Sequence, residues 1–317
     1  MNAKQFEIAS EQYITALPSM GKSKRTATAY DLAFRKFNAY LAEQQVDEII
    51  PLTVINWRSA LSGENIKSNT TRQYMFLIHS FFEWAIKMKI TTENPVLLDE
   101  IPQPKQIEHD LLTIDEIKKI LTVKPTSPMT GARNRAIIIL LLQTGLRNSE
   151  LRALTLDNID FANSRIVVEH GKGDKKRYVP LPELAKECIQ DYLRSPAYPP
   201  AIKSSDTLFG NDIDENGHHT NGAIWRPFNI TKLNDLVRRY TAKVCGHSVH
   251  THILRHAFTS LCDYSGMPMT EISQNLGHAN PIITAKVYRH ILDKDTAVQA
   301  GNKAMNKILD TLTLTNN

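Results

Sequence analysis

Cysteines, long apolar runs and nucleotide-binding motifs are all scarce or absent in this chain of 317 residues. Its three cysteines, Cys188, Cys245 and Cys262, are odd in number and form no CxxC pair, so neither a disulfide framework nor a cysteine-rich zinc site is expected. The longest apolar run, residues 136–142, is far shorter than the roughly 18 residues that cross a bilayer. The first residues lack the apolar core of a signal peptide. We therefore expect no membrane association and a reducing, cytoplasmic environment.

The composition is that of an ordinary globular protein, with 42% hydrophobic and 22% charged residues. The length allows two domains, each with its own core. A formal net charge of +5 is a mild basic excess, which is compatible with a nucleic-acid partner but does not establish one.

The hydrophobic pattern divides the chain into a helical first domain, a linker and a larger second domain. Residues 1–93 are expected to be all-helical, because apolar positions recur at helical spacing, as in Tyr30, Phe34, Phe37 and Leu41. Residues 94–110 contain three prolines and no periodicity, which is typical of a linker.

The second domain, residues 111–317, is expected to mix helices with a small β-hairpin. Thr113 and Glu116 form a capping-box pattern at its start, and Gly145 is a natural end for the apolar helix before it. Residues 165–181, RIVVEHGKGDKKRYVPL, predict two strands around a glycine-containing turn. Residues 195–222 are loop-like, and 296–310 predict a last short helix. The fold class is therefore mainly α with a small hairpin or sheet.

Two basic motifs in the second domain are candidates for phosphate chemistry. In TGLRNSEL, Arg147 lies three residues before Glu150, which can orient its guanidinium. Lys172 lies at the tip of the expected hairpin, where a lysine can protonate a leaving oxygen. The basic residues after it are candidate phosphate contacts: Lys175, Lys176 and Arg177. The simpler interpretations are a surface ion pair and a solvated basic turn.

Two histidine motifs and a tyrosine follow. In HILRH, His252 and Arg255 are expected on one helical face and His256 on a different side. In GHANPIITAKVYRHI, His278 precedes Tyr288 by ten residues. Taken singly, a core histidine and a half-buried tyrosine are the simpler interpretations. The histidines and the cysteine over 245–256 also suggest a metal site, but without CxxC or the zinc-protease glutamate we expect none.

Together these motifs resemble, in order, the boxes of the tyrosine recombinases, the phage-integrase family. The resemblance covers roughly residues 111–293, and residues 1–93 are similar to the family's helical core-site-binding domain. It implies a catalytic set without metal or nucleotide cofactor, supported by Glu150: Arg147, Lys172, His252, Arg255, His278 and Tyr288.

The resemblance also implies a mechanism. Tyr288 would attack a DNA phosphate and form a 3′-phosphotyrosyl link, the two arginines would hold the non-bridging oxygens, and Lys172 would protonate the leaving 5′-oxygen. Proton transfer from the tyrosine would be assisted by His252, while His278 would donate to a phosphate oxygen. The long segment 195–228 and the lack of an evident N-terminal arm-binding domain depart from the family pattern.

The expected partners are double-stranded DNA and further copies of the chain, as a tetramer on two DNA sites. An accessory protein or a partner recombinase is possible under this interpretation, and the protein would act in the cytoplasm, at the nucleoid. Lys24, Arg25 and Arg72 lie at expected helix starts and are candidate DNA contacts, with solvated, capped helix starts as the alternative.

Several functions stay open at this stage. The chemistry fits integration, excision, transposon resolution or chromosome-dimer resolution, and the DNA site is not readable from the sequence. A type IB topoisomerase and a DNA-binding accessory protein that does not cut are the two competing hypotheses.

Overall fold

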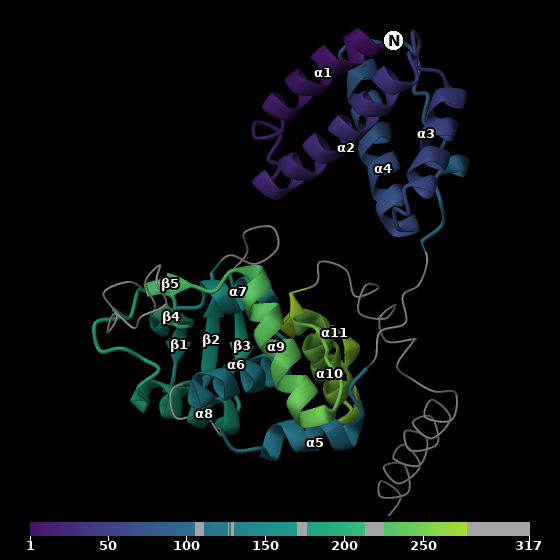
Figure 1. Ribbon diagram of the computed structural model, residues 1–317. Helices are drawn as coiled ribbons and strands as arrows, with labels where there is room; N and C mark the ends of the chain where they lie inside the picture. The colour runs from purple at the N-terminus through teal and green to yellow at the C-terminus, as the bar shows by residue number, and fades with distance from the viewer. Residues whose placement is uncertain (105–110, 126, 128–129, 170–175, 213–224, 278–317) are drawn as a thin grey trace, which may run out of the picture. The chain divides into compact units, whose positions relative to one another are not determined.

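The computed structural model describes residues 1–104, 111–125, 127, 130–169, 176–212 and 225–277. The chain forms two compact units, Met1–Glu108 and His109–Asn317. The described part is mostly helical with two small sheets, which confirms the expected fold class (Figure 1). No described helix is long and apolar enough to cross a membrane.

The first unit is a bundle of helices around an aromatic core. Its elements are α1 (Ala3–Ala16), α2 (Lys24–Glu43), α3 (Pro51–Gly63), α4 (Ser68–Lys87) and the short 3₁₀ helix η1 (Leu98–Glu100). The apolar face expected in α2 is buried. Phe6 of α1 makes edge-to-face contacts with Phe34 and Phe81, with ring centroids 5.7 and 5.0 Å apart. Such contacts favour a fixed arrangement of the bundle beyond simple burial of area.

Part of the expected linker packs on this helical unit. Val96 and Ile101 are buried in its core. The Arg58 guanidinium donates to the Glu100 carboxylate at 2.6 Å and to the backbone carbonyl of the same residue. The expected linker range of 94–110 therefore begins with residues that are held by the first unit.

The second unit is built around the helix α6, most of which is buried. The unit contains α5 (Ile114–Thr122), α6 (Gly131–Thr144), α7 (Asn148–Ala153), η2 (Leu156–Asn158), β1 (Ile159–Asp160), β2 (Arg165–Val168), β3 (Arg177–Pro180), α8 (Glu183–Arg194), β4 (Gly210–Asp212), β5 (Trp225–Pro227), α9 (Ile230–Cys245), α10 (Thr251–Tyr264) and α11 (Met269–Leu276). Residues 136–142 of α6 are entirely buried, with α8 and α10 packed against the helix. The apolar run of the sequence is thus the centre of this core.

The ends of two helices follow their sequence signals. The Thr113 hydroxyl accepts from the Glu116 backbone N–H, and the Glu116 carboxylate accepts from the Thr113 N–H, which confirms the expected capping box. Gly145 ends α6 at φ 61°, and a Cβ there would lie 2.5 Å from Phe258 and 2.9 Å from Leu276. Both the backbone conformation and the close packing therefore require glycine at this position.

The two sheets are small and antiparallel. The first has the order β1-β2-β3, and Val168 pairs with Arg177 at the end of the β2–β3 ladder that is nearest the turn of the expected hairpin. The second pairs β4 with β5, where Trp225 Nε1 donates to the Thr207 carbonyl at 2.7 Å. Strand β4 lies in the range expected to be loop-like and β5 lies just after it, and neither strand was predicted. Three residues each are too few to show alternation. The helix expected over 296–310 lies outside the described residues.

Candidate active site

Arg147 is held in place by Glu150 at the turn between α6 and α7. After Gly145 the chain leaves α6, and Arg147 becomes the N-cap residue of α7. Glu150 is only 7% exposed. Its carboxylate accepts hydrogen bonds from the Arg147 backbone N–H at 2.8 Å and from Arg147 Nη1 at 2.7 Å. The sequence prediction that Glu150 orients this guanidinium agrees with these contacts.

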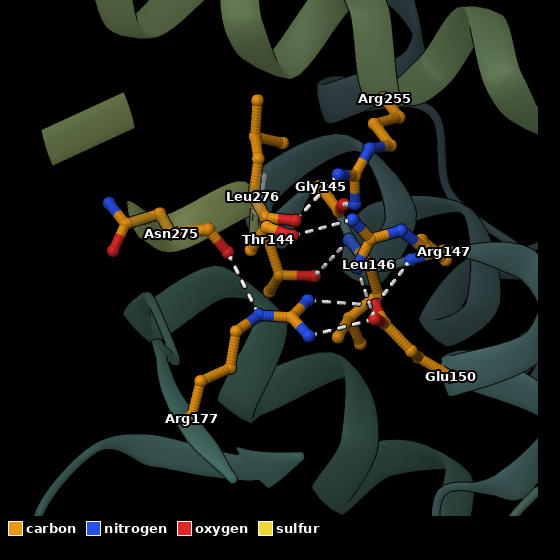
Figure 2. Close-up of polar contacts among 10 residues, drawn as sticks. Thr144, Gly145, Leu146, Arg147, Glu150, Arg177, Arg255, Asn275 and Leu276 are labelled. Atoms are coloured by element: carbon orange, nitrogen blue, oxygen red, sulfur yellow. Dashed lines mark hydrogen bonds and ion pairs between the residues drawn. The ribbon is translucent and has the colours of Figure 1, made fainter. Parts of the chain in front are cut away.

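Arg255 approaches the same place from α10. Its side chain is buried and donates to two backbone carbonyls, those of Gly145 and Leu276, the second at 2.7 Å. Arg147 Nη2 donates to the next carbonyl along, that of Gly277, at 2.8 Å. The two arginines, more than 100 residues apart in sequence, thus converge at the C-terminal end of α11, as Figure 2 shows for Arg147, Arg255 and Leu276.

Arg177 completes this group from the hairpin. Its Nη1 and Nη2 donate to the two oxygens of Glu150 at 2.7 and 2.8 Å, a bidentate pair, and its Nε donates to the Asn275 carbonyl at 3.2 Å (Figure 2). Its side chain is only 12% exposed. We refer to Arg147, Glu150, Arg177 and Arg255 together as the arginine cluster.

The arginine cluster carries three cations and one carboxylate in a largely buried place. Burial raises the pKa of Glu150, but hydrogen bonds from Arg177 and Arg147 outweigh it and bring that pKa down to about 2. Burial first, and then the neighbouring charge of Arg147, lowers the pKa of Arg255 to about 9. Glu150 and Arg255 are therefore charged at neutral pH, and three guanidiniums around one carboxylate leave an excess of positive charge that suits an anion.

His252 lies on the exposed side of α10, close to this group in sequence but not in the core. Its ring packs edge-to-face on the His256 ring, with centroids 5.1 Å apart. The expectation that His256 lies on a different side is therefore wrong, because residues four apart share one face of a helix.

Four residues of the predicted site lie outside the described residues: Lys172, Lys175, His278 and Tyr288. The described chain does show where it enters and leaves these segments. Strands β2 and β3 bracket residues 170–175, and α11 ends at Gly277, immediately before His278. The hairpin segment and the start of the last segment are therefore both attached to elements that contact the arginine cluster.

The predicted DNA contacts differ in their surroundings. Lys176 is half exposed, and its Nζ lies 3.3 Å from Glu169 Oε1. Lys24 and Arg25 are exposed at the start of α2, after the N-cap residue Ser23. These assignments stay predictions.

Arg72 and Arg177 are placed differently from the solvated contacts that we expected. Arg72 is half-buried; it donates to the Pro102 carbonyl and lies over the Phe76 ring, 4.6 Å from its centroid. Arg177 belongs to the arginine cluster described above. In both cases the guanidinium is engaged by protein groups, because the surrounding carbonyls and the carboxylate offer it partners.

Histidines in the stretch 245–256 contact different side chains and do not converge on one point. His247 Nε2 lies 2.8 Å from Glu116 Oε1, and His250 Nε2 lies 3.2 Å from Arg238 Nη2. Among the described residues no three histidine, cysteine, aspartate or glutamate side chains gather closely enough to hold a metal ion.

The role of Arg177 was missed at the sequence level, although a signal for it exists. In β3 the residues alternate between the two faces of the hairpin: Val179 is fully buried, whereas Tyr178 is 53% exposed. Arg177 is on the same face as Val179, opposite buried Val168. A strand period of two therefore places Arg177 on the inner face, away from a solvated turn.

Two family models match the chain. The model described as "Phage integrase family" matches residues 110–295, more than half of the chain. The model described as "Phage integrase, N-terminal SAM-like domain" matches residues 11–89. The two matches fall on the second and the first unit, respectively.

Curated relatives and solved structures agree with these matches. The chain is 28% identical to tyrosine recombinase XerC of Anoxybacillus flavithermus, over 85% of this chain and 88% of that protein. It is 25% identical to tyrosine recombinase XerD of Staphylococcus haemolyticus, over 90% and 94%. The fold matches that of the Tn1549 transposon integrase in complex with transposon right end DNA, with a TM-score of 0.70 at 18% identity, over 96% of this chain and 99% of that one. The chain therefore belongs to the phage integrase family, the tyrosine recombinases.

Proposed function

We propose that this tyrosine recombinase cuts and rejoins double-stranded DNA at specific sites, with Tyr288 as the nucleophile and the arginine cluster as the phosphate site. The observation that carries this proposal is the convergence of Arg147 and Arg255 on the end of α11. A buried guanidinium, that of Arg255, and a half-buried one, that of Arg147, meet at one point with an excess of positive charge around them, which suits a phosphodiester.

The arginines account for stabilisation of charge. Attack on a phosphodiester puts negative charge on the non-bridging oxygens, and fixed cations in a buried place stabilise that charge most. Arg255 is rigid because two backbone carbonyls hold it. Arg147 is rigid because Glu150 and the Gly277 carbonyl hold it. This preorganisation lowers the barrier because the cations need little rearrangement during the reaction.

The remaining groups supply the proton transfers. Tyr288 would form a bond to phosphorus as the bond from phosphorus to the 5′-oxygen breaks, which leaves a 3′-phosphotyrosyl link. Lys172 would give the 5′-oxygen its proton, while His252 would assist loss of the tyrosine proton and His278 would donate to a phosphate oxygen. A tyrosine hydroxyl with an ordinary pKa near 10 needs this help at neutral pH. The link keeps the energy of the phosphodiester, so rejoining requires no nucleotide cofactor.

The partners follow from this activity. DNA binding is supported by the bound DNA named for solved structures of similar fold, such as XerH bound to difH substrate, at a TM-score of 0.66 and 19% identity. We propose a homotetramer on two DNA sites, in the cytoplasm at the nucleoid, with candidate contacts at Lys24, Arg25, Arg72, Lys175 and Lys176. Integration or excision of a mobile element and resolution of chromosome dimers are the candidate biological tasks, with or without an accessory protein or a partner recombinase.

Covalent trapping tests the activity. We incubate three proteins with nicked duplexes from DNA that flanks the coding sequence: wild type, Arg255→Gln and the control Arg165→Gln. Arg165 is on β2 and does not belong to the arginine cluster. EDTA is present throughout. We expect a protein–DNA band that survives SDS for wild type and the control, and its loss for Arg255→Gln.

The same experiment separates the two alternatives. A clear gel shift without any SDS-resistant band for wild type would favour a DNA-binding protein that does not cut. Relaxation of supercoiled plasmids of unrelated sequence would favour a type IB topoisomerase, because such an enzyme has no need of a specific site.

A further inference from the structure

Arg177 contacts both α7 and the end of α11 in the candidate active site. It is the first residue of β3, directly after the segment that carries Lys172. Its guanidinium forms the bidentate pair with Glu150 and donates to the Asn275 carbonyl at the end of α11. A Cβ at Gly277 would lie 3.0 Å from Arg177 Nε, so the guanidinium packs against the turn that precedes His278. One side chain thus joins the hairpin, the α7 residue that holds Arg147, and the end of α11.

These contacts leave Arg177 poorly placed to bind DNA directly. All three of its nitrogen atoms donate to protein oxygens, at distances of 2.7, 2.8 and 3.2 Å. With 12% of the side chain exposed, a phosphate would have to displace Glu150 to gain a bidentate contact. Removing one partner of a buried ion pair is costly, because the remaining charge loses its compensation.

The charges of the arginine cluster give Arg177 a different task. Glu150 fixes Arg147 by accepting from both its backbone N–H and its side chain. A lone carboxylate in that position would also cancel the positive charge of Arg147, which the phosphate needs. Arg177 supplies a second cation to the same carboxylate, and the three arginines with one glutamate then keep an excess equal to the charges of Arg147 and Arg255.

We propose that Arg177 is a positioning residue of the phosphate site: it balances the charge of Glu150, so that Glu150 orients Arg147 without cancelling its charge. The proposal rests on the function proposed above. It assigns Arg177 to the electrostatics of the site, in place of the phosphate contact suggested by the basic run 175–177. Arg177 acts through Glu150 and Arg147, and it need not touch DNA.

A double-mutant cycle on Arg177 and Glu150 tests this proposal. The variants are Arg177→Gln, Glu150→Gln, the double variant, Arg177→Lys and the matched control Arg165→Gln, an exposed arginine on the neighbouring strand whose partner is Asp160. Thermal unfolding first shows that each variant is folded. The rate of covalent link formation is then measured in single turnover on the nicked duplexes, with the DNA affinity measured separately.

The proposal predicts how the rate of covalent link formation changes in each variant. Arg177→Gln slows link formation by about 100-fold, of the order seen when a group that stabilises transition-state charge is lost, with DNA affinity changed by less than about threefold. Adding Glu150→Gln to it recovers about tenfold, because the excess of positive charge is restored. Arg177→Lys keeps the charge but not the fork, and stays within about tenfold of wild type. A merely structural role predicts that the double variant is as slow as, or slower than, Arg177→Gln.

A second measurement does not depend on cleavage. Stabilisation of the folded protein by inorganic phosphate is followed by thermal unfolding for the same variants, with Arg147→Gln as the variant that lacks the site. We expect weaker stabilisation for Arg177→Gln and recovery in the double variant. Wild type that binds phosphate in this manner but never links to DNA would contradict the proposed function and leave the role of Arg177 intact. Equal phosphate stabilisation in wild type and Arg177→Gln, or no recovery in the double variant, would overturn the inference.

Discussion

Replacing Glu150 by glutamine removes the one negative charge of the arginine cluster while keeping the size of the side chain. The carboxylate is nearly fully buried, and contacts with Arg177 and Arg147 lower its pKa from the ordinary 4.5 to about 2 despite the opposing effect of burial. At about 1.4 kcal/mol for each unit of pKa, this difference is worth about 3 kcal/mol of folding stability at neutral pH. Glu150→Gln should lose about that amount.

The pH dependence of this loss follows from the direction of the pKa change. A carboxylate with a lowered pKa in the folded state stabilises the fold fully above its unfolded pKa of 4.5. The stabilisation then declines as the pH falls toward the folded pKa of about 2. The difference between wild type and Glu150→Gln should therefore be constant from pH 7 to 5 and shrink to about 2 kcal/mol by pH 3.5.

Urea denaturation of the full chain, followed by circular dichroism at each pH, measures this difference. The matched control is Asp191→Asn in the same unit, whose exposed pair with Arg194 should contribute less than about 1 kcal/mol. A loss for Glu150→Gln no greater than that of the control, or one that grows below pH 4.5, would refute the electrostatic account of the arginine cluster.

Three further predictions concern the nucleophilic reaction, the backbone and the assembly. Lys172→Ala should slow cleavage of a normal strand but have much less effect on a 5′-thio leaving group, which needs no proton; equal slowing of both would remove Lys172 as the general acid. Gly145→Ala should lower the free energy of unfolding by about 3 kcal/mol in denaturation experiments, because the new Cβ combines a positive φ with a clash. The control Gly246→Ala should cost about 1 kcal/mol, because Gly246 also has a positive φ but has no neighbouring atoms that a Cβ would meet. The helix predicted over 296–310 carries an apolar stripe, Ala297, Ala300, Ala304, Ile308 and Leu309, which we propose docks on a neighbouring copy of the chain. Truncation at about residue 295 should therefore prevent tetramers on DNA, as judged by native gel analysis, and tetramers formed by the truncated chain would reject this docking role.

The parts of the fold that could be predicted from sequence are those with local causes. Periodicity identified the buried face of α2, and the Thr113–Glu116 capping box and Gly145 marked helix ends, because each signal acts within one or two turns. The strands β4 and β5 were missed because short strands gain their stability from pairing, which the sequence of either strand does not show.

In the candidate site, too, local contacts could be predicted from the sequence and contacts between distant segments could not. The pairing of Arg147 with Glu150 was predictable because the two residues are three apart. The bidentate contact of Arg177 with Glu150 joins residues 27 apart, and Arg255 meets Gly145 over 110 positions. Such contacts depend on how the hairpin and α10 pack against α6, so local spacing predicted the residue types of the site but not their tertiary partners.

The central claim is that DNA becomes linked to the chain through Tyr288. Wild type and Tyr288→Phe are incubated with the nicked duplexes, and the SDS-resistant product is digested with protease and nuclease and examined by mass spectrometry. The account predicts a nucleotide on the Tyr288 hydroxyl in wild type, and no covalent product but an unchanged gel shift for Tyr288→Phe. A nucleotide attached to another side chain, or normal linkage by Tyr288→Phe, would contradict it.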